Sequence, residues 1–198
     1  MPGFREVQYY LAGLWLLIRM DPAGFRFLDM SDRGVNRSFW AFVWCLPPMG
    51  ISWLWWRESF LRTMPPHTDV GLVFYVRLGL VEAANWFVPL VLAGLLLLAM
   101  KKGERFSAVV VSVNWLGVPL SYINGLLLAL VFFLPGTIGI VSLLLLAFML
   151  AQVFAIARIL RMIFNGNGLL IGAMTLVLFV PALMLSEFMQ RFLGIYPV

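Results

Sequence analysis

Five long apolar segments are the feature that most restricts the fold of this chain. They cover approximately residues 38 to 57, 73 to 100, 107 to 132, 137 to 160 and 168 to 189. A helix needs about 20 apolar residues to cross the roughly 30 Å hydrocarbon layer of a bilayer, and each segment is long enough. Charged residues make up 12% of the chain, about half of their usual share in soluble domains. The sequence therefore predicts an all-α polytopic membrane protein whose five transmembrane helices form a membrane domain over residues 38 to 198.

The distribution of lysine and arginine predicts the orientation of these helices, because short cationic connections tend to stay on the cytoplasmic side. Ten cations lie before the first span and around the second and fourth connections: Arg5, Arg19, Arg26, Arg33, Arg37, Lys101, Lys102, Arg105, Arg158 and Arg161. The opposite side carries fewer, namely Arg57, Arg62 and Arg191, with Arg77 close by on the second span. We therefore expect a cytoplasmic N-terminus and a C-terminus on the outer side.

The first 37 residues are expected to form a cytoplasmic segment of short amphipathic helices at the membrane interface. Apolar residues of the first stretch share one helical face: Val7, Tyr10, Leu11, Leu14, Leu17 and Ile18. This stretch is too short to cross a bilayer, so it is expected to lie in the headgroup layer. Asp21 followed by Pro22 is typical of a helix N-cap and first helical position, which predicts a second short helix that ends near Asp29.

Two ionisable residues near the start of the second apolar segment raise the question of a polar site inside the membrane. Counting about 20 residues back from Met100 places the outer edge of the hydrocarbon near Val81. Glu82 then lies at the interface, Arg77 lies beyond it, and Trp86 falls where an aromatic anchor is common. In this arrangement the hydrocarbon core holds no charge, which argues against an ion or proton path.

A deeper position of Glu82 is the alternative. If residue 73 stood at the bilayer edge, Glu82 would lie about 13 Å deep, at roughly 1.5 Å per residue. A carboxyl group at that depth needs a polar partner, which Tyr122 or Asn124 of the third segment could supply. The candidate residues for a polar interhelical or transport site are Arg77, Glu82, Asn85, Asn114, Tyr122, Asn124 and Gln152.

Small residues predict where two of the helices approach most closely. The candidate packing face comprises Ala147, Ala151, Ala155, Gly168 and Gly172. Small side chains let membrane helices pack at short distance, and "NGNG" at 165 to 168 supplies a turn between the fourth and fifth segments. We therefore expect these two segments to form a tight antiparallel hairpin, with Asn114, Tyr122 and Gln152 in interhelical hydrogen bonds.

Motifs for catalysis, metal binding or nucleotide binding are absent from the sequence. His67 is the single histidine and Cys45 the single cysteine, which is too few for the usual metal sites within one copy. Neither a P-loop nor an H-E-x-x-H motif occurs. The basic residues are divided among short connections and form no single patch for nucleic acid. We therefore expect no cofactor, no metal, no nucleic-acid partner and no enzymatic activity.

Two stretches of the chain resemble the Yip domain family. "LDMSDRGVNRSFWAFVWCLP" at 28 to 47 is similar to the approach to the first span in bacterial Yip-like proteins, and "LLLLAFMLAQVFAIARIL" at 143 to 160 is similar to their fourth span. The resemblance implies a five-helix fold in the cytoplasmic (inner) membrane of a bacterium. Eukaryotic members carry a D-L-[YW]-G-P-type motif before the first span. This chain lacks the motif, so their binding of small GTPases is not implied.

Two functions from different classes are compatible with this sequence. The first is a non-enzymatic accessory, assembly or interaction protein that packs against lipids and other membrane proteins, or against a second copy. The alternative is a small transporter or channel with a polar path between the second, third and fourth spans. Because polar side chains that join membrane helices are commoner than polar side chains that bind cargo, we expect the first function.

Overall fold

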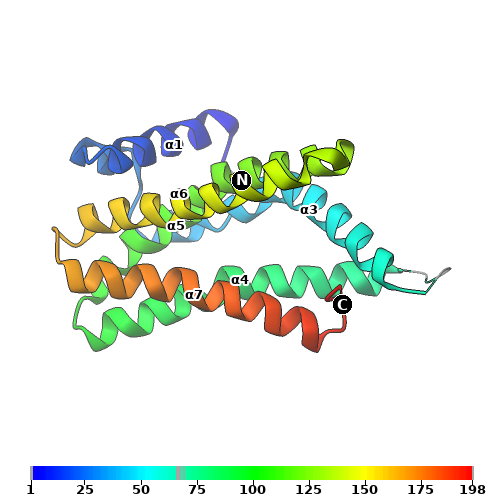
Figure 1. Ribbon diagram of the computed structural model, residues 1–198. Coiled ribbons are helices and arrows are strands. Elements are labelled where there is room, and N and C mark those ends of the chain that lie inside the picture. Colours follow the sequence, from blue (N-terminus) through cyan, green and yellow to red (C-terminus); the bar gives the residue numbers. More distant parts are fainter. Residues whose placement is uncertain (1, 66–67, 69, 198) are drawn as a thin grey trace.

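A computed structural model describes residues 2–65, 68 and 70–197 of the chain (Figure 1). Most of these residues are helical and no strand occurs among them, which confirms the predicted all-α class. The long helices are α3 (Ala41–Thr63), α4 (Leu72–Ala99), α5 (Phe106–Phe133), α6 (Ile138–Ile163) and α7 (Gly168–Phe192). The shorter helices are α1 (Phe4–Ile18), η1 (Pro22–Phe27), α2 (Asp32–Ser38), η2 (Gly103–Arg105) and η3 (Pro135–Thr137). His67 lies outside the described residues.

Four segments are long and apolar enough to cross a membrane: α4, Gly103–Phe133, α6 and α7. They coincide closely with the second to fifth predicted spans, which identifies the chain as a membrane-type helical protein. The first predicted span, 38 to 57, falls mostly within α3, which is not among the four. Two prolines interrupt the apolar run of α3, and Arg57, Glu58 and Arg62 follow it in the same helix.

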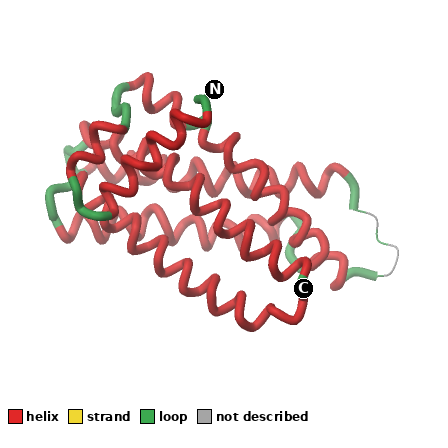
Figure 2. Tube along the Cα trace, turned by 90° about the horizontal axis from the view of Figure 1, so that it is seen from above, coloured by secondary structure: helices red, strands yellow, loops and turns green. Residues whose placement is uncertain are grey.

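The long helices lie side by side along one axis, as two perpendicular views show (Figures 1 and 2). α3 packs mainly on α5, α4 packs mainly on α7, and α6 contacts both α5 and α7. The expected neighbours α6 and α7 are in contact, but α7 packs more extensively on α4. A Cβ atom added to Gly168 or Gly172 would meet nothing within 4 Å, so these glycines do not bring two helices together.

A close approach of two long helices lies between α3 and α5. A Cβ atom added to Gly125 of α5 would lie 2.7 Å from Pro48 Cβ of α3. Gly125 and Pro48 are both buried. The absence of a side chain at Gly125 therefore allows the proline ring of α3 to rest directly on the backbone of α5, which is the usual role of small residues between membrane helices.

The N-terminal helices cover one flank of α5 and α6 (Figure 1). The inward face of α1 is apolar and buried: Val7, Tyr10, Gly13, Leu14 and Leu17. α1 also packs closely on η1, since a Cβ atom added to Gly13 would lie 2.9 Å from the carbonyl oxygen of Gly24. The face that the sequence marked as apolar therefore packs against protein.

Side-chain caps fix the short helices that follow α1. Asp21 accepts a hydrogen bond from the Ala23 N–H at 2.9 Å and begins η1, as its sequence predicts, although η1 is a 3₁₀-helix that ends at Phe27. Ser31 Oγ caps α2 by accepting from the Gly34 N–H at 3.2 Å. The Ser31 hydroxyl and N–H both donate to Asp29, and these hydrogen bonds lower the pKa of the Asp29 carboxyl group.

The residues after α7 turn back onto the ends of α3 and α4. Arg77 Nη1 donates to the Leu193 carbonyl at 2.7 Å, and Trp56 Nε1 donates to the Ile195 carbonyl at 2.9 Å. Ile195 is 1% exposed and completes a second, smaller core that is separate from the main one and includes Phe60, Phe74, Leu78 and Val81. The C-terminal segment therefore joins α3, α4 and α7 at this end of the bundle (Figure 1).

Candidate functional site

A chain of three buried or half-buried polar side chains crosses the bundle near the middle of α4. The Trp86 indole of α4 donates to Asn114 Oδ1 of α5 at 3.0 Å. Asn114 Nδ2 in turn donates to Ser38 Oγ of α2 at 2.9 Å, and the Ser38 hydroxyl donates to the Val35 carbonyl at 2.7 Å. Asn114 is 1% exposed and Ser38 is fully buried. Each group has a partner, so these hydrogen bonds stabilise the contact between three helices.

A cavity of about 140 Å³ adjoins this hydrogen-bonded chain. It lies between α4, α5, α6 and α7, and polar groups of Asn85, Trp86 and Asn114 line it together with apolar side chains such as Ile156 and Leu178. Asn85 Oδ1 is buried and has no hydrogen-bond partner among the described residues. Asn85 therefore combines a place in the cavity wall with an unpaired amide oxygen, next to an amide and an indole that are already paired.

Glu82 lies one helical turn from Trp86 on α4 and faces α3. Its side chain is close to the Trp53 indole of α3, and Cys45 of α3 lies beside Ser121 of α5. Glu82 is half-buried, and none of the ion pairs within the described part of the chain includes it. No hydrogen bond within the described ranges joins Glu82 to Tyr122 or Asn124, the residues that the sequence suggested for a deep Glu82.

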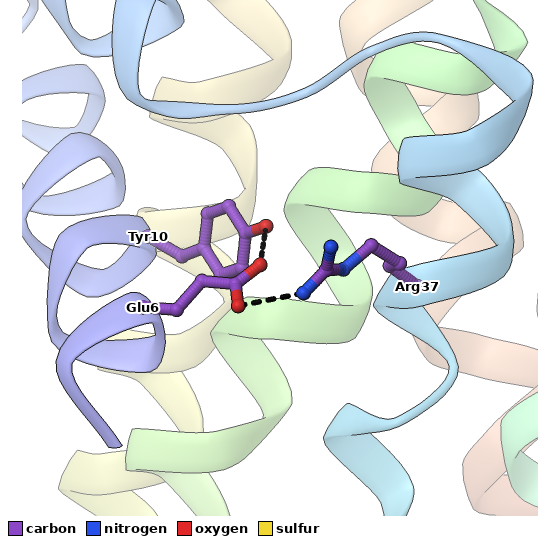
Figure 3. Close-up of polar contacts among 3 residues, drawn as sticks. All are labelled: Glu6, Tyr10 and Arg37. Atoms are coloured by element: carbon purple, nitrogen blue, oxygen red, sulfur yellow. Dashed lines mark hydrogen bonds and ion pairs between the residues drawn. The ribbon is translucent and has the colours of Figure 1, made fainter. Parts of the chain in front are cut away.

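A second polar cluster joins the N-terminal helices to one another (Figure 3). Arg37 Nη2 of α2 forms an ion pair with Glu6 Oε2 of α1 at 2.7 Å, and the Tyr10 hydroxyl donates to Glu6 Oε1 at 2.6 Å. The Tyr10 ring stacks on the buried Trp115 ring of α5 with 4.6 Å between centroids. Burial, and then the hydrogen bond to Glu6, raise the pKa of Tyr10 to about 12.

The remaining predicted polar residues lie apart from these two clusters. Arg77 is occupied by the Leu193 carbonyl at the end of the bundle. Tyr122 is 45% exposed on the outside of α5. Asn124 and Gln152 are half-buried, and neither lines the cavity beside Asn85. Of the seven candidate residues, Asn85 and Asn114 share the cavity and Glu82 lies one turn away.

Several polar contacts were missed in the sequence. Trp86, which we expected at the outer headgroup level, points instead into the bundle and pairs with Asn114. Ser38 and the Glu6–Arg37 pair were not singled out. The one available signal was that Glu6 and Tyr10 stand four residues apart and so share a face of a helix. Nothing in the local sequence indicates that Arg37, 31 residues further on, would meet them.

The small residues of the predicted packing face are largely uncovered. Ala147 and Ala151 of α6 are exposed, as are Gly168 and Gly172 of α7, while Ala155 is half-buried. In α6, 6% of the most apolar stretch is buried, against 28% in α4 and 22% in α7. The part of α6 from Leu143 to Ala151 therefore has few protein neighbours.

Chemically, the described residues provide amide, indole, hydroxyl and carboxyl groups. Among them, no three His, Cys, Asp or Glu side chains come together as a metal-binding group. Comparison with known proteins adds no assignment, since no family model, no curated protein and no solved structure matches this chain.

Proposed function

We propose that this chain is a non-enzymatic, multi-pass membrane protein that acts by binding another membrane protein through the exposed part of α6 from Leu143 to Ala151. The observation that carries this proposal is the exposure of α6, where Leu143, Leu146 and Leu150 are 69%, 52% and 61% exposed. Ala147 and Ala151 lie exposed among these leucines and leave room for the close approach of a second helix. An accessory or assembly subunit needs such a surface.

Five crossings are proposed, with α2 and α3 together forming the first. Ser38 at the end of α2 pairs with Asn114, and Pro48 of α3 rests on Gly125, so the two helices follow α5 in the same direction. α3 has 23 residues and can cover roughly 30 Å at about 1.5 Å per residue. With the cationic connections inside, the N-terminal helices lie on the cytoplasmic side and residues 193 to 197 lie on the outer side.

The resemblance to the Yip domain family fits this arrangement and stays a proposal. It adds the cytoplasmic membrane of a bacterium as the expected location. The outward faces of α1 and η1 then belong at the inner headgroup layer, where the exposed rings of Tyr9 and Trp15 are suited to an interface.

Purification of the full chain in a mild detergent tests the interaction. Ala147→Leu with Ala151→Leu is expected to remove a co-purifying membrane protein, because the leucines prevent close helix contact. Ala99→Leu at the exposed end of α4 is the matched control and is expected to retain the partner. Retention of the same complex by the double variant would contradict the proposal. If the purified complex contains only this chain, the partner is a second copy of it.

Transport is the second candidate function, and the cavity beside Asn85 is the observation that favours it. A small polar solute would bind in the cavity of about 140 Å³, where Asn85 lines the wall and has an unpaired amide oxygen one turn from Glu82. Glu82→Gln and Asn85→Leu would then alter solute flux in proteoliposomes, whereas Asn124→Leu would not. Equal flux in all variants and in protein-free vesicles would exclude this function.

A further inference from the structure

We propose that the end of the bundle next to η2 binds an anionic phospholipid, with the phosphate between η2 and the start of α7 and an acyl chain beside α4. The site lies at the other end of α6 from the exposed Leu143 and is separate from the cavity at Asn85. It combines a small polar pocket with an apolar groove on the adjoining side of the same short turn.

The polar pocket has a volume of about 90 Å³ and brings two cations to the amino end of α7. Lys102 and Arg105 line it from one connection, and Asn165 and Asn167 line it from the other. This volume exceeds that of two liquid waters, at roughly 30 Å³ each, and suits a phosphate group. Cations, amide donors and the positive end of a helix dipole all favour an anion.

The backbone holds these groups in place. The Lys102 N–H donates to the Leu97 carbonyl at 2.8 Å and closes the end of α4. Asn167 Oδ1 accepts from the Leu170 N–H at 3.2 Å, which leaves the amide N–H groups of Asn167 free to donate. The first turn of α7 contains no acidic residue.

One carboxylate lies near the pocket and must be considered. Glu104 Oε1 is 3.9 Å from Arg105 Nε, and both side chains are substantially exposed. At this distance and exposure the pair is weak and screened by water, so Arg105 remains able to bind a phosphate bidentately. Lys102 is in none of the ion pairs within the described ranges.

The apolar groove lies on the neighbouring side of η2. Val91, Gly94, Leu95 and Leu98 of α4, with Gly103 and Phe106, enclose about 270 Å³. In a 3₁₀ turn, residues three apart share a side, so Lys102 and Arg105 face the pocket while Gly103 and Phe106 face the groove. A lipid with its phosphate in the pocket has this groove beside it for an acyl chain. At the end of four apolar helices, the pocket belongs at headgroup depth.

Lipid binding to the purified full chain tests this proposal. The probes are phosphatidylglycerol and phosphatidylcholine in detergent micelles, followed by native mass spectrometry, with inorganic phosphate as a soluble anion. We expect phosphatidylglycerol to be retained more strongly than phosphatidylcholine. Lys102→Gln with Arg105→Gln is expected to weaken phosphatidylglycerol binding roughly tenfold or more, because the variant loses the attraction of two cationic side chains for the anionic headgroup.

The matched control removes two charges from the same end of the bundle without touching the pocket. Lys101→Gln with Arg161→Gln is expected to leave phosphatidylglycerol binding within about twofold, since neither residue lines the pocket. Val91→Trp narrows the groove from a residue that does not line the pocket, and it is expected to weaken lipid retention. Equal losses in both double variants, or no loss in either, would overturn the proposal. Competition by inorganic phosphate as strong as that by phosphatidylglycerol would also overturn it, because the site would then bind a free anion.

Discussion

Trp86 of α4 and Asn114 of α5 form the central polar contact of this bundle, with 3.0 Å between the indole nitrogen and the amide oxygen. Asn114 passes the connection on to Ser38, so one amide links α4, α5 and α2. In a bilayer the hydrophobic effect contributes little to helix association, and packing and hydrogen bonds of this kind take its place.

Replacement of Asn114 by alanine is expected to destabilise the fold by about 1 to 2 kcal/mol, because it leaves the Trp86 N–H and the Ser38 hydroxyl with one partner fewer. Unfolding of the purified protein in mixed micelles measures the change. Asn124→Ala on the same helix is the control, since no side-chain hydrogen bond of Asn124 occurs among the described residues, and we expect a smaller effect. Equal destabilisation by both variants would show that the hydrogen bonds of Asn114 to Trp86 and Ser38 do not contribute to stability.

A side chain at Gly125 is expected to separate α3 from α5. The added methyl group of Gly125→Ala would lie 2.7 Å from Pro48 Cβ, and neither the proline ring nor the helix backbone can rotate away from it. Overpacking of this kind costs about 1 to 3 kcal/mol. Thermal unfolding should show a lower midpoint for Gly125→Ala, whereas Gly172→Ala, which meets nothing within 4 Å, should be neutral or slightly stabilising. An unchanged midpoint for Gly125→Ala would contradict the close contact.

The Tyr10 hydroxyl should make the docking of α1 sensitive to alkaline pH. The pKa of Tyr10 is raised from 10.0 to about 12, so the folded protein holds the phenolic proton more tightly than the unfolded chain does. This contribution to stability is complete below about pH 10 and disappears as the pH rises through about 12. The tyrosinate absorbance of the wild type should contain one late-titrating component.

The Tyr10→Phe variant provides the control for this titration. The late component should be absent from it, while the stacking on Trp115 is preserved because the ring remains. Loss of the hydrogen bond to Glu6 is expected to reduce stability by about 1 to 2 kcal/mol at neutral pH. A titration in which wild type and Tyr10→Phe differ only in amplitude near pH 10 would contradict the assignment.

Cysteine accessibility should distinguish five crossings from four. In a Cys45→Ala background, single cysteines at the exposed positions Arg26, Thr68 and Glu104 can be treated with a membrane-impermeant maleimide in intact cells. We expect Thr68→Cys to react from outside and Arg26→Cys and Glu104→Cys to react only after the membrane is opened. If α3 does not cross, Thr68→Cys and Arg26→Cys will react from the same side.

The positions of the long helices were predictable because length and apolarity are properties of single segments. The range 168 to 189 anticipates α7, and 73 to 100 anticipates α4. Which helices pair was not predictable, because apolar residues surround each helix and no single stripe marks a partner. Gly168 and Gly172 suggested that α7 would pack tightly on α6, yet α4 is its main partner.

The polar contacts were likewise predictable only in part. Asn114 stood out in the sequence because an amide in an apolar helix must find a partner, but its partners, Trp86 and Ser38, lie 28 and 76 residues away. A tryptophan suits both a headgroup position and an interior hydrogen bond, so the sequence alone did not show that the Trp86 indole points into the bundle. The surroundings of Glu82 include Trp53 of α3, another contact between distant segments that the local sequence does not indicate.

The seating of Ile195 has a consequence for biosynthesis. Trp56 and Arg77 find their carbonyl partners only in residues that leave the ribosome after α7. During translation these ends of α3 and α4 therefore lack their carbonyl partners until the residues that follow α7 have been made. Maturation of this end is thus ordered in time, and a nascent chain halted before Leu193 would be recognisable by proteolysis near Thr63 even though its membrane helices are already in place.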